Sequence, residues 1–203
     1  RANRETLDIF EQVFREHPDK KDLRWRIEHA QHLSAADIPR FARDGMIASM
    51  QPTHATSDMP WAEERLGPER LPGAYAWKSL LTAGARLALG SDFPVESPDP
   101  LRGLYAAVTR QDAQGRPPGG WLPGERLALG RALSGFTAGA AYAAHREKEL
   151  GRLAPGYWCD VTVIDRDLSG VPPGEILNAR VVATVIGGQL VWPLAAPVPP
   201  PAR

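Results

Sequence analysis

The stretch Arg86-Leu-Ala-Leu-Gly-Ser-Asp-Phe-Pro-Val-Glu96 decides the fold. Leu87–Leu89 is a short apolar run that follows the helix-ending Gly84, and this pattern predicts a strand buried on both faces, as in parallel sheets. Asp92 comes just after the C-terminal end of that strand, where barrel enzymes place their catalytic groups. The alternative is that the Asp92 carboxylate accepts a backbone N–H in a turn near Pro94.

Two earlier runs share the pattern of a strand followed by a polar side chain. Leu23–His29 alternates apolar and charged residues before it reaches His29. Met46–Met50 leads into Gln51-Pro-Thr-His54, where the proline predicts the end of regular structure and the start of a long loop. Three successive strand-helix units predict a parallel α/β arrangement, most simply part of a barrel.

The spacing of apolar residues predicts helices between and after these strands. They are expected around Leu7–Phe14, around Ile38–Ala42 after a capping box at Ser34–Asp37, and over Tyr75–Leu81, Leu101–Val108, Glu125–Leu133 and Thr137–Ala144, the last with Thr137 as N-cap.

The composition changes at Gly151. Beyond it, Tyr157–Ile164 and Arg180–Trp192 are rich in valine, and Gly187-Gly188 is typical of a hairpin turn. We therefore expect a small all-β unit at the end of the chain, closed by a polyproline-like tail over residues 197–203.

Composition and charge limit the classes of function. The 203 residues are 43% hydrophobic and carry 24 basic and 24 acidic side chains, so the chain can fill a core and offers no net field for nucleic acid or an anionic membrane. No apolar run is long enough to span a bilayer. The single cysteine, Cys159, lies in a valine-rich run that predicts a buried thiol, and it fits a reducing compartment such as the cytoplasm. The sequence starts at Arg1 and shows neither an initiator methionine nor a signal-peptide pattern, so we expect the chain to continue a longer protein.

His29 and Asp92 are the candidate metal ligands. They follow separate strands of one predicted sheet, and a neutral imidazole with a carboxylate suits zinc. The alternative for His29 is a hydrogen-bonded structural histidine. The chain has no Gly-x-Ser-x-Gly elbow, phosphate-binding glycine loop, Cys-x-x-Cys pair or His-Glu-x-x-His helix, which disfavours serine catalysis and nucleotide binding.

Ordered motifs along most of the chain carry a family resemblance. They are Arg26-Ile-Glu-His-Ala-Gln31, Met50-Gln-Pro-Thr-His-Ala-Thr-Ser-Asp-Met-Pro-Trp61, Leu89-Gly-Ser-Asp-Phe-Pro-Val-Glu96, Ala107-Val-Thr-Arg-Gln-Asp112, Gly120-Trp121 and Gly151–Asp165. Together they resemble the family 3 branch of the metal-dependent amidohydrolases, which includes N-substituted formamide deformylases. Cys159 stands where that family would be expected to have a small residue.

The resemblance implies a TIM-type barrel that holds one or two metal ions, usually zinc, although other divalent metals fit as well. It makes His29 a metal ligand and Asp92 both a ligand and the catalytic proton acceptor. His54, Trp61 and Phe93 are expected to contact substrate. The family's His-x-His pair, bridging carboxylate and earlier histidine have no counterpart, so the chain resembles the C-terminal half of such an enzyme. Residues 1–150 would be a partial barrel, and residues 151–203 a β-rich part of a small sandwich domain with its Pro-rich tail.

We therefore predict a hydrolase of a non-peptide carbon–nitrogen bond, of the amide or N-formyl type, present as a fragment that is inactive alone. Its expected partner is a small amide-type substrate, with no nucleic acid and no membrane, and the protein is a possible homo-oligomer. The alternative is a non-catalytic remnant or interaction module that cannot assemble the metal site.

Overall fold

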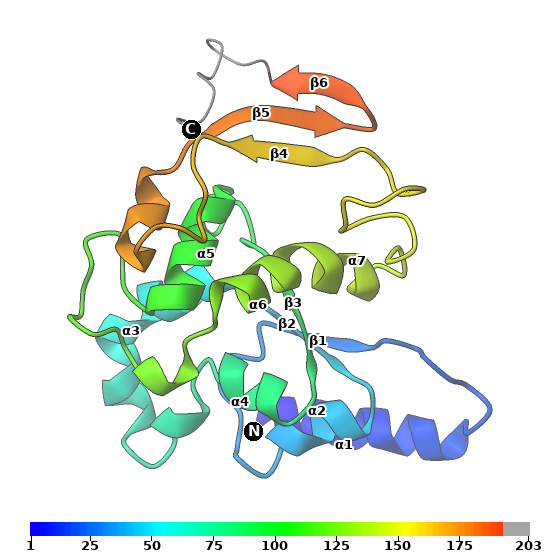
Figure 1. The fold of residues 1–203 in the computed structure, drawn as a ribbon. Coiled ribbons are helices and arrows are strands. Elements are labelled where there is room, and N and C mark those ends of the chain that lie inside the picture. Colours follow the sequence, from blue (N-terminus) through cyan, green and yellow to red (C-terminus); the bar gives the residue numbers. More distant parts are fainter. Residues whose placement is uncertain (193–203) are drawn as a thin grey trace.

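The computed structural model describes residues 1–192, so the predicted polyproline-like tail lies outside the described residues (Figure 1). The α-helices are α1 (Ala2–Glu16), α2 (Ile38–Arg43), α3 (Pro52–Leu66), α4 (Trp77–Thr82), α5 (Pro100–Thr109), α6 (Leu129–Ser134) and α7 (Ala140–Ala143). The strands are β1 (Arg26–Glu28), β2 (Ile47–Met50), β3 (Arg86–Leu89), β4 (Val161–Ile164), β5 (Val181–Ile186) and β6 (Gln189–Trp192). Short helical turns are η1 (Leu71–Gly73), η2 (Pro123–Glu125), the π-helical η3 (Gly135–Gly139) and η4 (Pro173–Asn178).

The first three strands form one parallel sheet in the order β1-β2-β3, as the sequence predicts. Ser49 in β2 pairs with Glu28 on one side and Ala88 on the other, so the three strands end at the same edge. Leu87, Ala88 and Leu89 are all buried, which confirms a strand covered on both faces. Their short apolar sequence suits this environment, because neither face meets water.

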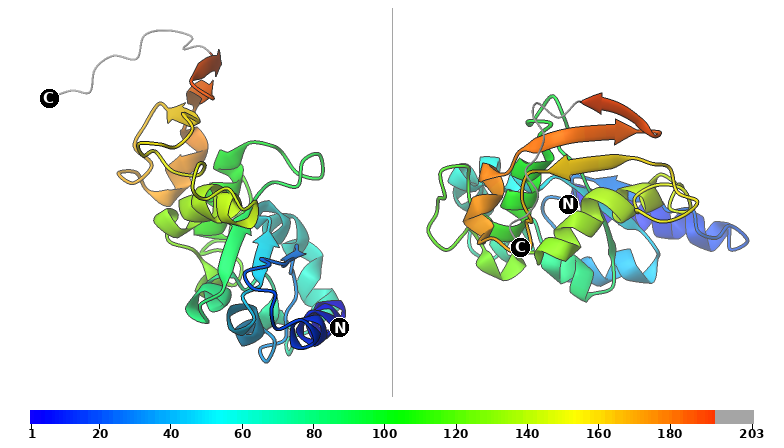
Figure 2. Two further views of the ribbon diagram at one scale, coloured as in Figure 1. Left: turned by 90° about the vertical axis from the view of Figure 1, so that its right-hand side faces the viewer. Right: turned by 45° about the horizontal axis from the view of Figure 1, so that its top comes forward.

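The helices cover the parallel sheet from two sides. Helices α1, α2 and α4 lie on one side and α6–α7 on the other, with the sheet of β4–β6 forming a further layer beyond α7 (Figures 1 and 2). Side chains of the sheet alternate accordingly: Ala48 belongs to the main core with Phe41 and Leu80, whereas Ile47 packs with Ala143. This arrangement keeps the C-terminal edge of the sheet free for polar groups.

The segment after β2 differs from the prediction, because Gln51-Pro-Thr-His54 does not begin a loop. It begins the 15-residue helix α3. Proline is well tolerated at the first helical position, where its missing N–H has no partner to lose, and Pro52 occupies that position. The hydrophobic pattern does not indicate this helix, because the hydrophobic residues that it fully buries include the small Ala55 and Ala62, which give little apolar periodicity.

Two predicted helix caps are wrong. The predicted capping box Ser34–Asp37 does not form: α2 begins at Ile38 with Asp37 as the residue before it, and no side chain caps the helix. The Ser34 hydroxyl instead accepts from Arg4, and the Asp37 carboxylate accepts from Arg4 and Arg40. Thr137 lies within η3, between α6 and α7, and its hydroxyl donates to the carbonyl oxygen of Leu133, 2.8 Å away. Residues 129–143 thus form one helical run rather than two helices separated by a cap. The predicted 125–133 helix begins later, at Leu129, because η2 ends at Glu125 and residues 126–128 are not helical.

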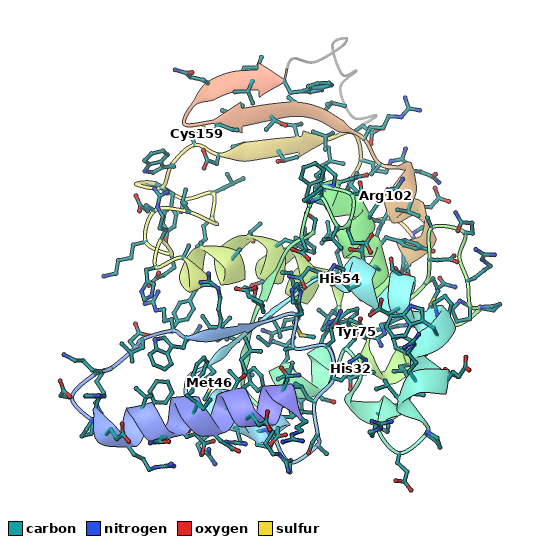
Figure 3. The ribbon with its side chains drawn as sticks, turned by 180° about the vertical axis from the view of Figure 1, so that it is seen from behind. His32, Met46, His54, Tyr75, Arg102 and Cys159 are labelled. Carbon is teal, nitrogen blue, oxygen red and sulfur yellow. The ribbon has the colours of Figure 1, made fainter. Side chains whose placement is uncertain are left out.

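The end of the described chain forms an antiparallel sheet in the order β4-β5-β6, and Gly187-Gly188 turns between the last two strands as predicted. Both glycines have positive φ, 57° and 80°, which such a turn requires. Cys159 is exposed, contrary to the prediction of a buried thiol. Cys159 lies just before β4, beside the hairpin turn at the end of the sheet (Figure 3). Its carbonyl oxygen accepts a hydrogen bond from the N–H of Gly188 in that turn.

A cationic side chain joins the two ends of the parallel unit. Arg24 donates two hydrogen bonds to Glu147, at 2.7 and 2.9 Å, and its guanidinium lies 3.9 Å from the ring centroid of Tyr142. These contacts connect the segment before β1 to the segment after α7.

Within residues 1–192, no helix is long and apolar enough to cross a membrane.

Candidate metal centre

Three potential metal ligands meet at the C-terminal edge of the parallel sheet. His29 follows β1, His54 lies in the first turn of α3 after β2, and Asp92 follows β3. One ligand atom from each residue lies within 4.8 Å of those of the other two. Figure 3 shows His54 at the start of α3, near the centre of the molecule. The parallel register brings the three side chains together, because equivalent strand ends meet at one edge.

The backbone at two of these residues is in the left-handed region. His29 has φ 67°, its neighbour Ala30 has φ 40°, and Asp92 has φ 59°. Non-glycine residues are uncommon in this region, and sparsely populated backbone conformations cost about 1–3 kcal/mol each. Such conformations cluster at functional sites, where the surrounding structure holds them, so the geometry marks this edge as a candidate site.

The imidazole of His54 is buried without a hydrogen bond. The residue is 7% exposed, and neither Nδ1 nor Nε2 has a hydrogen-bond partner within the described structure. Its Nε2 lies 3.6 Å from Asp92 Oδ2, too far for a direct hydrogen bond. A buried polar atom left unpaired costs about 1–3 kcal/mol. A cation held between the ring and the carboxylate would give His54 the partner that the protein does not supply.

His29 and Asp92 are more open to solvent than His54. The His29 ring lies 5.5 Å from the His54 ring between centroids, and its Nδ1 is 2.9 Å from Gln51 Oε1. The side chain of Asp92 is 36% exposed, and no described backbone N–H donates to its carboxylate. The arrangement therefore favours the ligand interpretation of Asp92 over the turn-capping one, and it leaves the site accessible to water and to a small molecule.

The three predicted substrate contacts lie in different environments. His54 joins the ligand cluster itself. Phe93 is next to Asp92 in the chain and 65% exposed. Trp61 is 41% exposed and stands seven residues beyond His54 on α3, which corresponds to about 10 Å along the helix axis. The structure thus brings His54 into the ligand cluster, places Phe93 directly after Asp92 and sets Trp61 further along α3.

Two of the motifs quoted above meet in a buried support behind the site. Arg110 is fully buried, donates to the carbonyl oxygens of Trp121 and Tyr75 at 2.8 and 2.9 Å, and stacks on Trp77 with 4.3 Å to the ring centroid. Burial lowers the pKa of Arg110 to about 10, so it stays cationic at neutral pH. The Thr-Arg and Gly-Trp motifs therefore have a structural role in this chain.

The hydroxyl of Tyr75 connects this support to α3. It donates to the carboxylate of Asp58, and burial together with that bond raises the pKa of Tyr75. Asp58 follows His54 by one helical turn. The helix that carries His54 is thus tied to this support by a partly buried hydrogen bond.

Sequence reasoning missed one residue of the site, Gln51. It is 7% exposed and its side chain reaches the ring of His29. Glutamine is neither titratable nor a usual zinc ligand, so its residue type does not mark it as part of a site. The signal in the sequence is its position directly after β2, which pairs with β1.

The fold and this edge define the chain as an α/β protein whose candidate ligands gather at the carboxyl ends of parallel strands. The chain belongs to the amidohydrolase family, because the model of that family matches residues 1–192. The predicted resemblance is confirmed at this level.

Similar proteins support the assignment. The chain is 38% identical over 197 residues to the protein LONG AFTER FAR-RED 3 of Arabidopsis thaliana, a match that covers 95% of this chain and 33% of that protein. It is 29% identical over 189 residues to the N-substituted formamide deformylase of Arthrobacter pascens, covering 91% of this chain and 33% of that protein. The chain therefore spans about a third of the length of the curated relatives it matches.

A solved structure extends the likeness to three dimensions. The crystal structure of an uncharacterized metal-dependent hydrolase from Pyrococcus horikoshii OT3 matches with a TM-score of 0.64 and 31% identity, covering 75% of this chain and 29% of that one. This likeness and the mixed helices and strands of the chain agree with the predicted α/β fold class.

Proposed function

We propose that this chain forms the C-terminal part of a metal-dependent amidohydrolase that hydrolyses a non-peptide carbon–nitrogen bond. The supporting observation is the buried, unpartnered imidazole of His54 beside His29 and Asp92. Two neutral imidazoles and one carboxylate are a donor set that suits zinc, and other divalent metals of similar preference also fit. This assignment makes His54 a ligand in place of the substrate contact predicted from the sequence.

A metal ion bound there would polarise the substrate carbonyl and lower the pKa of its bound water. The protein groups divide the remaining work. His29 and His54 would fix the position of the ion without changing the net charge of the site, because a neutral imidazole donates a lone pair and carries no charge. Asp92 has two carboxylate oxygens, so one can act as ligand while the other accepts the proton of the attacking water and passes it to the leaving nitrogen.

The substrate class proposed is a small amide or N-formyl amine. The exposed carboxylate of Asp92 and its exposed neighbour Phe93 leave the site open to such a molecule. The likeness to a formamide deformylase supports the N-formyl type among the choices. We further propose that the remaining family ligands come from the part of the barrel that this chain does not span.

Zinc binding by the full-length gene product tests the proposal. After removal of bound metal with a chelator, titration with zinc against a competing indicator is expected to show binding that the His54→Ala variant weakens by about 10-fold or more. His17→Ala is the matched control, because His17 is exposed at the end of α1 and outside the cluster. Equal zinc affinity in all three proteins would contradict the site. Tight binding without hydrolysis of N-formyl and N-acyl amines would instead favour the non-catalytic alternative.

A further inference from the structure

Gln51 uses its side chain for His29 alone. It is the residue before helix α3, yet its side chain makes no capping hydrogen bond to that helix. Its Oε1 lies 2.9 Å from His29 Nδ1, which is the hydrogen bond found for this side chain in the described structure. Its backbone carbonyl meanwhile accepts from the N–H of His54, 3.1 Å away. One buried residue therefore forms a hydrogen bond with each of the two histidines, through its side chain to His29 and through its backbone to His54.

The direction of this hydrogen bond decides which nitrogen of His29 is free. An amide oxygen can only accept, so the nitrogen that faces it must carry the proton. With Nδ1 protonated, a neutral imidazole keeps its lone pair on Nε2. The ring of His29 is otherwise poorly restrained, because the residue is exposed and follows the last position of a short strand.

From this geometry we infer that Gln51 is a positioning residue that holds His29 as the Nδ1–H tautomer and so leaves Nε2 as the nitrogen with a free lone pair. The inference rests on the proposed function for its consequence, since only a metal at this edge makes the free Nε2 useful. A neutral amide serves better than a carboxylate in one respect, because it orients the ring without adding negative charge to the site. Partners that orient a ligand histidine typically change metal affinity by about 10- to 100-fold.

Two substitutions separate orientation from packing. Gln51→Met keeps the length and removes the acceptor, whereas Gln51→Glu keeps an acceptor oxygen at the same reach. Gln12→Met is the control, since Gln12 pairs with Glu16 on the exposed face of α1. Thermal unfolding establishes that each variant is folded, and Gln51→Asn, which is one methylene too short to reach the ring, replaces Gln51→Met if the latter does not fold.

The tautomer is read directly by ¹⁵N NMR of the metal-free full-length gene product with labelled histidine, near pH 8, where an ordinary histidine is neutral. His29→Ala identifies the signals of His29. We expect Nδ1–H in the wild type, in Gln51→Glu and in Gln12→Met, and a loss of that tautomer in Gln51→Met. The inference is overturned if wild-type His29 carries its proton on Nε2, or if Gln51→Met leaves the tautomer unchanged.

Zinc affinity gives the second measurement. We expect Gln51→Met to weaken zinc binding by about 10- to 100-fold and Gln51→Glu to restore most of it. Unchanged affinity in Gln51→Met, with the tautomer lost, overturns the positioning role. If the wild type binds no zinc while its tautomer still depends on Gln51, the proposed metal function fails and the hydrogen-bond assignment stands, so the two failures are distinguishable.

Discussion

Asp92 combines three properties that suit a reacting carboxylate: a left-handed backbone, a position at the end of a buried strand and a partly exposed side chain. We predict that Asp92→Asn, in the full-length gene product, keeps the fold because it preserves the side-chain volume. Turnover of N-formyl or N-acyl amines should fall by about a hundredfold to ten-thousandfold, since an amide cannot accept the proton of water.

The control is Asp19→Asn, a change in an exposed carboxylate of the turn after α1. Steady-state hydrolysis and zinc content are measured for both variants. Activity of Asp92→Asn within about tenfold of wild type, with metal still bound, would show that Asp92 is not the general base.

The sequence predicts site residues that directly follow a strand, but it does not predict a residue whose contact depends on how two strands are paired. The sequence predicts His29 and Asp92 as a ligand pair from their positions after two strand-like runs, and the structure brings them together with His54. Their role as ligands stays a prediction. Gln51 could not be inferred, because its contact with His29 requires knowing that β1 and β2 are paired and end together.

At the scale of elements, glycine sets the distance between the helical run 129–143 and β3. A Cβ added at Gly139 would overlap the carbonyl oxygen of Leu87, and one added at Gly135 would lie 2.7 Å from the side chain of Leu89. The bulge of η3 contains both glycines, so the helix approaches the strand that delivers Asp92 as closely as backbone atoms allow.

We predict that Gly139→Ala lowers the free energy of unfolding by about 1–3 kcal/mol, because the backbone of β3 or η3 must shift to make room. Gly130→Ala is the matched control, since Gly130 lies in α6 with open space around its Cβ position. That change should raise stability by about 0.5–1 kcal/mol through helix propensity. Urea unfolding of the two variants measures the difference, and equal stabilities would contradict the close contact.

Helices and strands were predictable where their buried residues give a hydrophobic period in the sequence. They were missed where the buried residues are small or where the helix is not a regular α-helix. The strands β1–β3 and helix α5 follow from their apolar patterns. Helix α3 buries alanines, and η3 is a π-helical turn that continues a helix through two glycines, so neither leaves a clear signal in the hydrophobic pattern. The predicted cap at Thr137 was wrong for this reason.

For the whole molecule, two features favour association of the 203-residue chain when it is produced alone. Strands β1 and β3 each have one strand neighbour within residues 1–192, so the parallel sheet is open at both edges. The antiparallel sheet also presents apolar side chains that are 53–61% exposed, namely Ile186, Leu190, Val191 and Trp192. Open edges and apolar patches recruit other chains.

We therefore predict that light scattering of this chain, at a monomer mass of 22.1 kDa, shows self-association, and that added zinc does not yield hydrolysis of N-formyl or N-acyl amines. The three proposed ligands, which follow three strands, would not by themselves complete the walls that orient water and substrate. Replacing Leu190 and Trp192 with serine identifies which feature dominates, because it removes apolar surface and leaves the open edges of β1 and β3 in place. Reduced association in that variant assigns the effect to the antiparallel sheet, and unchanged association assigns it to the parallel one. A monomer that turns over substrate would refute the proposal that the catalytic site needs more of the barrel than this chain provides.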